Sequence, residues 1–506
     1  MSFIGKENRH FSSVSRHGPY CPFKKFCVFL GGESPEGILT ERNYLRTRVD
    51  ELEGAVNFGT EQVIELRKKN AELEMEKENI QKDLVRALQS PFKKYEVKEI
   101  SENPKKRGAP FGHPGYFRKR PDGVDEYIDV RIEKCPHCGN KSLSPCSHIT
   151  EHVQEDIEGG RLKTTCFVHS HYWCAVCKKV VHGRGANEIP NAFIGPDARA
   201  KAAFLRYEIK VSYDDVPRVL RNLCGLSVTP GAIVGFDNKV CRKGAPLYEA
   251  LKETLPETHC IHVDETGWKR DWLWIFTNEQ IAFFHIDEHR SSAVVRAHLG
   301  EFYKGVLVTD FYSAYRNLVP AFAKQKRCTH LIRDVKELLD NKLPGSPDDE
   351  AFLKTLKTLV QDAIFLHRQH SILTADEYRS GRKKILKRFR TLYQHPPLSH
   401  HEADNIRKRL IAHKNELFTF LKYPEVEPTN NRSEQGLRSS VIFRKIIFGN
   451  RSEQGKKNVS LIMTILRTAR LKMLSPIGAL KTILTEGVTQ ELLKQFGIPS
   501  QMPQAP

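Results

Sequence analysis

The sequence lacks any apolar run of the roughly 20 residues that a helix needs to cross a lipid bilayer. A short apolar stretch near the N-terminus, FCVFLGG, lacks the small-residue pattern at which a signal peptide is cleaved. We therefore expect a cytoplasmic protein.

Acidic residues are also in deficit. The chain has 80 Lys and Arg against 61 Asp and Glu, which gives a net charge of +19 and a pI of about 9.3. Such an excess favours binding to polyanions, most simply nucleic acid, although ribosome-associated and membrane-surface proteins share it. At 506 residues with 39% hydrophobic content, the chain is long enough for two or more domains with apolar cores.

Disulfides are not expected, because the 12 cysteines occur in a long chain without a secretion signal. Two CxxC pairs, Cys135 with Cys138 and Cys174 with Cys177, have the spacing of a closed four-thiolate zinc site. We expect a structural zinc ribbon over 131–185 rather than a redox pair. Exchange of ligands with nearby residues stays open, and the candidates are Cys146, His148, Cys166, His169 and His171.

A heptad pattern over 41–90 predicts a coiled coil. Apolar residues recur at alternating steps of four and three: Leu45, Val49, Leu52, Val56, Val63, Leu66, Leu73, Ile80 and Leu84. Gly59, Asn70 and Lys77 fall on the same seam, and a buried Asn tends to select two strands in one register. A single amphipathic helix packed on its own protein is the alternative. The narrow stripe favours self-association as a homodimer or higher oligomer.

Two flanking segments show no such pattern. Residues 1–40 are expected to form a disordered tail. Residues 91–130 are rich in Pro, Gly and basic side chains, and they are typical of a linker that is either solvated or laid along phosphates.

Residues 191–245 predict a helix-turn-helix domain. Two helical stretches come first, the second ending at Gly225, and Thr229 with Pro230 then opens a third helix as N-cap and first helical residue. The last helix of such a unit enters the DNA major groove. Any compact trihelical unit has a similar pattern.

Residues 257–475 contain the pattern that organises the chain. CIHVDETGWKR is a short apolar strand that ends on the acidic pair Asp264 and Glu265. Two more strand-like runs, a helix and a fourth strand, GVLVTDFYSAY, follow, and Asp310 ends the fourth strand. This is the order of a ribonuclease H-like fold, in which strands one and four are neighbours and bring Asp264 to Asp310. Two such carboxylates suit Mg²⁺, although a strand-end Asp is more often a turn residue.

The third carboxylate is expected after a basic helical insertion at about 341–425. The hexapeptide NRSEQG occurs twice and offers Glu434 and Glu453. Glu434 follows paired asparagines and opens a helix. Glu453 follows VIFRKIIFGN, which we interpret as strand-like, and is expected in a loop. We therefore favour Glu434, since a rigid element holds a carboxylate more steadily. An apolar helix packed on the sheet and a C-terminal tail over 476–506 are expected to follow.

Taken in order, these motifs resemble a known family. The coiled coil, GHPG linker, CxxC pairs, helix-turn-helix, HVDETGW, VTDFYSAY and NNRSEQGLR together resemble the bacterial transposases of insertion sequence sixty-six, from about residue 41 to 490. The resemblance implies a nucleoid-associated DDE transposase, with Asp264, Asp310 and Glu434 as its metal-binding triad. It also implies roles for His330 and Arg333. Relatives usually have Cys three positions before this His, whereas Cys328 lies two before it.

The expected architecture is therefore multidomain α+β, with a coiled coil, zinc ribbon and helix-turn-helix before a ribonuclease H-like α/β core with a helical insertion. The expected activity is cleavage of terminal inverted repeats and joining of the 3′-OH to target DNA. Two Mg²⁺ ions, or Mn²⁺, about 3.5–4 Å apart would assist it. Arg333, Arg438 and Arg444 are candidate phosphate clamps, and accessory proteins of the same element are candidate partners. The alternatives are an inactive DNA-binding regulator and a structure-specific nuclease on the same fold.

Overall fold

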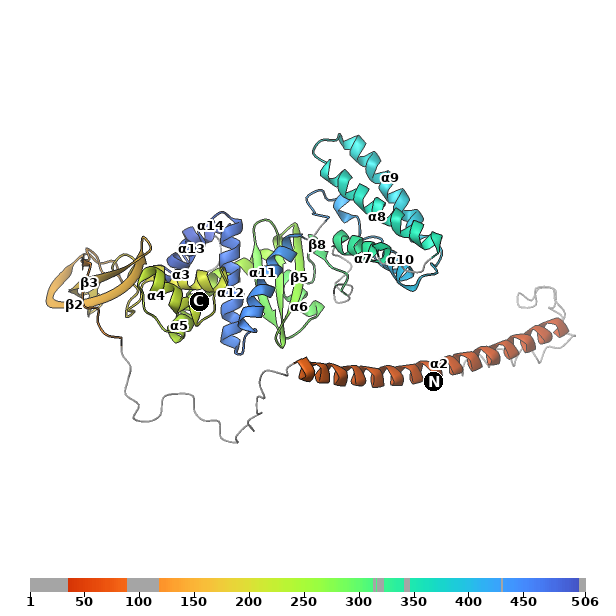
Figure 1. The fold of residues 1–506 in the computed structure, drawn as a ribbon, viewed down its shortest axis with the longest axis horizontal. Coiled ribbons are helices and arrows are strands. Elements are labelled where there is room, and N and C mark those ends of the chain that lie inside the picture. The colour runs from red at the N-terminus through yellow and green to blue at the C-terminus, as the bar shows by residue number, and fades with distance from the viewer. Residues whose placement is uncertain are drawn as a thin grey trace, which may run out of the picture. The chain divides into compact units, whose positions relative to one another are not determined.

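The computed structural model describes residues 35–88, 118–312, 315, 323–340, 346–428 and 431–499. The chain is mixed α+β and divides into two compact units, Met1–Tyr116 and Phe117–Pro506 (Figure 1). Most of the tail expected over 1–40 and most of the linker expected over 91–130 lie outside the described residues. Among the described helices, none is both long and apolar enough to span a membrane.

The first unit contains one helix, α2 (Pro35–Leu88), of 54 residues. Its described seam positions are exposed apolar side chains: Leu45, Val49, Leu52, Val56, Val63, Leu66 and Leu73. A helix that exposes an apolar stripe of this length is typical of one face of a coiled coil.

The second unit begins with a four-stranded sheet. Its strands are β1 (Glu126–Val130), β2 (Leu143–Glu158), β3 (Arg161–Cys174) and β4 (Lys179–His182). Strand β3 is central, pairing in parallel with β1 and antiparallel with β2 and β4. Because β1 falls within 91–130, the segment that we expected to be linker ends in folded structure.

Three helices follow the sheet: α3 (Pro196–Tyr207), α4 (Asp215–Cys224) and α5 (Pro230–Thr254). Gly225 ends α4 with a left-handed φ of 77°, and the Thr229 hydroxyl accepts from the Ala232 amide at 3.2 Å to cap α5. Both termini agree with the sequence prediction. The 25-residue α5 and the short 3₁₀ turn η2 (Leu255–Glu257) then run directly to the second sheet, without a linker.

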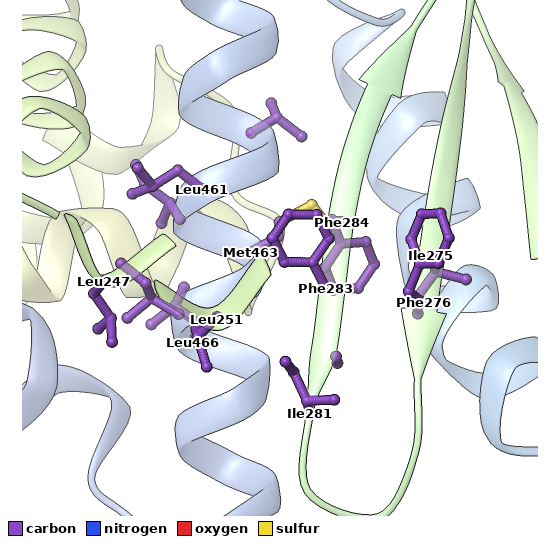
Figure 2. Packing of buried hydrophobic residues seen from close by; sticks show 14 of the residues in the cluster. Leu247, Leu251, Ile275, Phe276, Ile281, Phe283, Phe284, Leu461, Met463 and Leu466 are labelled. Carbon is purple, nitrogen blue, oxygen red and sulfur yellow. The ribbon is translucent and has the colours of Figure 1, made fainter. Parts of the chain in front are cut away.

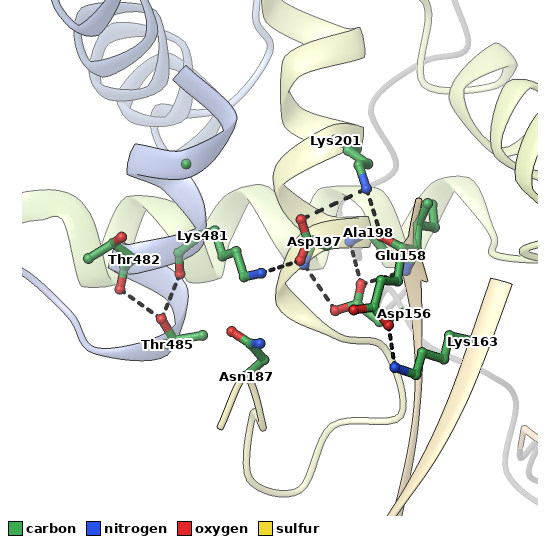
Figure 3. Close-up of polar contacts among 12 residues, drawn as sticks. Asp156, Glu158, Lys163, Asn187, Asp197, Ala198, Lys201, Lys481, Thr482 and Thr485 are labelled. Atoms are coloured by element: carbon green, nitrogen blue, oxygen red, sulfur yellow. Dashed lines mark hydrogen bonds and ion pairs between the residues drawn. The ribbon is translucent and has the colours of Figure 1, made fainter. Parts of the chain in front are cut away.

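A strand of the first sheet caps the first of these helices. Asp156, near the end of β2, accepts from the amides of Asp197 at 3.2 Å and Ala198 at 2.6 Å (Figure 3). The N-cap residue itself is Gly195, where a Cβ atom would lie 2.3 Å from the Asp156 carboxylate. Glycine at the cap thus lets a carboxylate from another element supply the cap, which joins the sheet to α3.

The second sheet has five strands in the order β7-β6-β5-β8-β9. They are β5 (Cys260–Trp268), β6 (Asp271–Thr277), β7 (Ala282–Asp287), β8 (Val306–Thr309) and β9 (Ala323–Lys326). The first three are antiparallel, and β8 and β9 run parallel to β5. Helix α6 (Ser292–Leu299) connects β7 to β8 and ends at Gly300, as the sequence predicts.

Helix α12 (Glu453–Leu471) lies between α5 and the β7 edge of this sheet (Figure 2). Three of its hydroxyls, spaced by four residues, accept hydrogen bonds from alternate amides of β7. The pairs are Ser460 with Ile286 (3.2 Å), Thr464 with Phe284 (2.9 Å) and Thr468 with Ala282 (3.2 Å). The helix thereby closes a sheet edge that would otherwise be open to pairing.

Helix α11 (Asn431–Ile447) includes most of the run VIFRKIIFGN, so our strand-like interpretation of that run is wrong. Its buried residues Leu437, Ser440 and Phe443 recur every three positions, which is a helical spacing rather than the alternation of a strand.

The remaining helices form two groups. The first group shares a core with Val306 and Val308 of β8, and it contains α7 (Cys328–Asp340), which precedes the insertion, and the insertion elements α8 (Pro347–Arg368), α9 (Ala375–Tyr393), α10 (His401–Ala412) and the turn η4 (Thr419–Leu421). The segment we set apart as a C-terminal tail contains α13 (Pro476–Thr485) and α14 (Gln490–Gln495), which pack into the core of the five-stranded sheet.

Candidate active site

Two aspartates lie level with one another at the ends of adjacent parallel strands. Strand β5 pairs with β8 so that His262 is opposite Val308. The same register carried two residues further sets Asp264 opposite Asp310, which directly follows β8. Asp264 is buried and Asp310 half-buried. The two carboxylates therefore share one edge of the sheet.

The charge on Asp264 is balanced by a buried arginine. Burial raises the pKa of Asp264, Arg327 lowers it, and the nearby Asp310 raises it again. The Arg327 guanidinium is 2.8 Å from Asp264 Oδ2 and its side chain is only 2% exposed. Sequence reasoning missed Arg327, although a charged residue directly after the short strand β9 was a signal available in the pattern.

Asp310 is positioned through its backbone and its neighbours. The Tyr312 amide donates to Asp310 Oδ1 at 2.9 Å. The buried Lys326 ammonium donates to the Asp310 carbonyl at 2.8 Å and to the Thr309 hydroxyl at 3.0 Å. Lys326 thus links the end of β9 to the end of β8 and holds the backbone of Asp310 in place.

Glu265, the second residue of the acidic pair, has a different environment. Burial raises the pKa of Glu265, and it accepts a hydrogen bond from the Tyr315 hydroxyl. Arg290 lies 2.8 Å from Glu265 Oε1, with its guanidinium over the rings of Trp272 (4.5 Å) and Tyr312 (3.8 Å). With both oxygens bonded within the protein, Glu265 is placed to orient Arg290.

Helix α11 packs on the sheet face that carries Asp264. Ile275 is directly opposite Asp264 across β5 and β6, so the two side chains share a face. A Cβ atom at Gly436 would lie 2.6 Å from Ile275 Cδ1, so glycine is what allows the helix to approach so closely. Glu434 lies two residues earlier, in the first turn of α11, and its side chain is outside the described part of the chain.

The rival glutamate is in a helix, not in the loop that we expected. Ser452 caps α12 by accepting from the Gly455 amide at 3.2 Å, and Glu453 is the first residue of that helix. Its side chain is 75% exposed and 2.7 Å from Lys456. Lys456 also contacts Asp271 at 3.0 Å, and Asp271 pairs with Trp268, four residues beyond Asp264 on β5. Both NRSEQG copies therefore lie at the start of a helix. The two glutamates differ in where their helices begin relative to the sheet.

The four predicted basic residues have different surroundings. Arg444 donates to the Gly267 carbonyl of β5, which fastens α11 to that strand. Arg438 is exposed on α11 and Arg333 is exposed on α7, while His330 is half-buried in the first turn of α7.

Cys328, whose role the sequence left in doubt, is wholly buried, and burial raises the pKa of its thiol to about 12. Its sulfur lies 3.6 Å from the Leu417 carbonyl oxygen. A neutral thiol in this environment serves packing rather than reactivity.

The four predicted zinc ligands converge. Cys135 Sγ lies 3.7 Å from Cys177 Sγ, Cys138 Sγ lies 3.6 Å from Cys174 Sγ, and all four sulfurs are within 4.8 Å of one another. A tetrahedral ion with Zn–S bonds of about 2.3 Å separates its thiolates by about 3.8 Å. The quartet therefore fits a closed zinc site.

The backbone beside Cys135 favours its thiolate, whereas a hydrogen bond with Cys138 and burial raise the pKa of Cys177. Burial opposes ionisation, but hydrogen bonds from the backbone amides of Cys138 and His137 lower the pKa of Cys135 to about 6. Each CxxC pair is followed by a left-handed residue, Gly139 (φ 72°) or Lys178 (φ 51°), which turns the chain back around the sulfurs. The alternative ligands Cys146 and Cys166 are not part of this cluster.

Comparison with known proteins identifies the family of the chain. The model of the transposase IS66 family matches residues 191–458, which is more than half of the chain and spans α3 to the first turns of α12. The uncharacterized protein y4hP of Sinorhizobium fredii (strain NBRC 101917 / NGR234) is 22% identical over 426 residues, covering 73% of this chain and 74% of that protein. The chain belongs to the transposase IS66 family.

Proposed function

We propose that this chain is a DDE transposase that binds the ends of its element, cleaves them and joins the freed 3′-OH to target DNA. The observation that carries the proposal is the placement of Asp264 and Asp310 on neighbouring strands, on the sheet face over which α11 and Glu434 begin. The sheet order, with three antiparallel strands followed by two parallel ones and a helical insertion before α11, supports a ribonuclease H-like core.

The donor atoms suit Mg²⁺ or Mn²⁺, which take hard oxygen ligands. Asp310 is close enough to Asp264 for its negative charge to disfavour the ionised form of Asp264, an effect that a divalent cation relieves. Asp264, Asp310 and Glu434 would hold the ions. Bound there, the ions supply Lewis-acid activation of the attacking oxygen and charge stabilisation of the leaving 3′ oxygen.

The remaining residues position this site and its DNA. Arg327 balances the charge of Asp264 before metal binds, and Lys326 fixes the start of the Asp310 loop. Arg333 and Arg438 are exposed and serve as phosphate contacts. Arg444 stays a candidate phosphate contact, and its guanidinium also bonds β5, where it fastens α11.

We assign end recognition to the helical trio and the zinc ribbon. The N-terminal turn of α5 is exposed and made of small residues, Thr229 to Gly231, which allows close approach to DNA. Arg221 on α4 is exposed as well. Zinc held by the four cysteines would fix the fold of the ribbon, since four thiolates leave no open position.

The test is metal-dependent cleavage of labelled DNA that carries the sequences flanking this reading frame. We expect Asp264→Asn, Asp310→Asn and Glu434→Gln to abolish 3′-end cleavage and strand transfer while DNA binding persists. Glu453→Gln is the matched control from the other NRSEQG copy and should retain most of its activity. An inactive Glu453→Gln beside an active Glu434→Gln would show that the triad assignment is wrong.

The same assay separates the alternatives. Binding without cleavage in either Mg²⁺ or Mn²⁺ would indicate a regulator. Cleavage of branched DNA without any need for inverted repeats would indicate a structure-specific nuclease.

A further inference from the structure

A second cluster of ligating side chains lies in the zinc-ribbon region, apart from the four cysteines. It combines His152 of β2, His169 of β3 and Glu188 of the loop that follows β4. Glu188 Oε1 lies 2.5 Å from His152 Nδ1 and 2.9 Å from His169 Nε2. His169 and Glu188 are buried, and His152 is half-buried. Two imidazoles and a carboxylate thus converge on one point inside the protein.

Hydrogen bonding alone does not satisfy this cluster with neutral rings. His152 Nε2 lies 3.2 Å from the Ala192 carbonyl oxygen, which only accepts, so Nε2 carries the proton. In the neutral ring Nδ1 is then an acceptor, and it faces Glu188 Oε1, which is also an acceptor when ionised. His169 Nε2 faces the same oxygen and can donate to it from a neutral ring, so the conflict lies at His152 Nδ1. A cation among these atoms removes the conflict.

Backbone hydrogen bonds orient Glu188 and His152, as is common for side chains that bind metals. The Gly185 amide donates to Glu188 Oε2 at 2.7 Å, which leaves Oε1 directed at the two rings. The Ala192 carbonyl fixes the His152 tautomer that exposes the Nδ1 lone pair. A Cβ atom at Gly185 would lie 2.3 Å from Phe167, so glycine is needed for the loop to reach Glu188's position.

We propose that His152, His169 and Glu188 form a second metal site, which binds a divalent transition-metal ion of the zinc class. Two imidazoles and one carboxylate are a ligand set that zinc uses in proteins. The three ligand atoms lie within 4.8 Å of one another, so small side-chain rotations bring them around one ion. The ion would join the strands of the ribbon to the loop that leads into α3, and so fix the ribbon against the helical trio.

Zn²⁺ itself is the first probe. Full-length protein prepared with zinc and freed of excess ion should contain about two zinc ions per chain, one for each site. Glu188→Gln, which keeps the size of the side chain but removes its charge, should lower the content to about one. Glu151→Gln is the matched control. Glu151 is next to His152 on β2, is exposed and forms an ion pair with Arg120. This substitution should leave the zinc content unchanged.

Spectroscopy distinguishes failure of this site from failure of the cysteine site. With Co²⁺ in place of zinc, Glu188→Gln should lose about half of the bound cobalt but keep the thiolate-to-cobalt charge-transfer band. X-ray absorption of wild-type protein at the zinc edge needs no variant, and it should show nitrogen or oxygen ligands together with sulfur. A zinc environment of sulfur alone, or one zinc per chain unchanged in Glu188→Gln, would overturn the proposal and leave a buried network with a protonated His152.

Discussion

Arg327 shows how one buried side chain balances the charge of a candidate catalytic aspartate. It is almost fully buried against Asp264, and removal of one partner from a buried ion pair leaves a charge uncompensated. If Asp264 and Asp310 bind a divalent ion, as we propose, that ion would compete with Arg327 for Asp264. Stability and metal affinity should therefore respond to Arg327 in opposite directions.

We expect Arg327→Gln to lower the melting temperature in EDTA, by an amount equivalent to about 3 kcal/mol. Added Mg²⁺ should raise the melting temperature of the variant more than that of wild type, because the ion takes over the charge balance. Arg333→Gln, at an exposed position on the adjoining α7, is the control and should behave as wild type. An equal Mg²⁺ response in Arg327→Gln and wild type would contradict this role.

Asp237 of α5 is a second buried charge, and it makes stability depend on pH. Its carboxylate accepts hydrogen bonds from Tyr207 at 2.9 Å and Tyr213 at 2.6 Å. Burial raises the pKa of Asp237 to about 6, although both tyrosines lower it. A folded-state pKa above the unfolded value means that the group stabilises the fold at low pH, and that this stability is lost as pH rises through about 6.

The expected loss is about 3 kcal/mol between pH 4 and pH 7, for a pKa shift of about two units. Asp237→Asn should remove it, so the melting temperature of the variant should rise relative to wild type as pH increases. Differential scanning fluorimetry across this range would measure the effect, with the exposed Asp376→Asn as control. Parallel curves for wild type and Asp237→Asn would rule out the assignment.

At the scale of elements, the contact between α12 and β7 requires hydroxyl side chains at defined positions of α12. Thr464 accepts from the Phe284 amide and donates to the Ser460 carbonyl at 2.7 Å, wholly buried. Thr464→Val keeps the shape but leaves the Phe284 amide unpaired, which should cost about 1–3 kcal/mol. Hydrogen exchange of β7 should accelerate. The exposed Thr358→Val on α8 is the control, and an equal effect of both changes would mean that β7 does not depend on this contact.

Element types were predictable where local signals agreed. The strands that carry Asp264 and Asp310, the α4 end at Gly225 and the Thr229 cap all follow from periodicity and capping chemistry. The segment 441–447 was misread because short β-branched runs fit either a strand or a buried helix face, and only packing against the sheet decides. Glu453 was expected in a loop because α12 begins several residues before the apolar periodicity that indicates a helix.

At the scale of the molecule, contacts between distant segments were beyond sequence reasoning. Arg327 and Asp264 lie far apart in the chain, and nothing local in either segment indicates the other. Glu188 lies in a loop without regular structure, so its approach to His152 and His169 depends on the path of that loop over the sheet. The four cysteines could be paired because their spacing is itself the signal.

The long helix α2 makes a prediction about the assembled protein. We expect a fragment spanning Glu41 to Leu88 to form a parallel dimer, which would let the full chain pair two DNA ends. Asn70→Leu should raise its melting temperature and loosen its stoichiometry, because a buried amide selects register at a cost in stability. Sedimentation equilibrium is the measurement. A monomeric fragment at high micromolar concentration would remove the pairing role.

Helix α5 passes from one core to the other without interruption. Its N-terminal half packs with α3 and α4, and Leu247 and Leu251 in its C-terminal half belong to the core of the five-stranded sheet. Twenty-five helical residues measure about 37 Å, close to one turn of B-DNA. If the helical trio binds the element end and the five-stranded sheet cleaves it, as we propose, α5 couples the two events through one helix. DNA lengthened or shortened by half a turn between the bound sequence and the cleaved bond would then present the wrong face to the carboxylates.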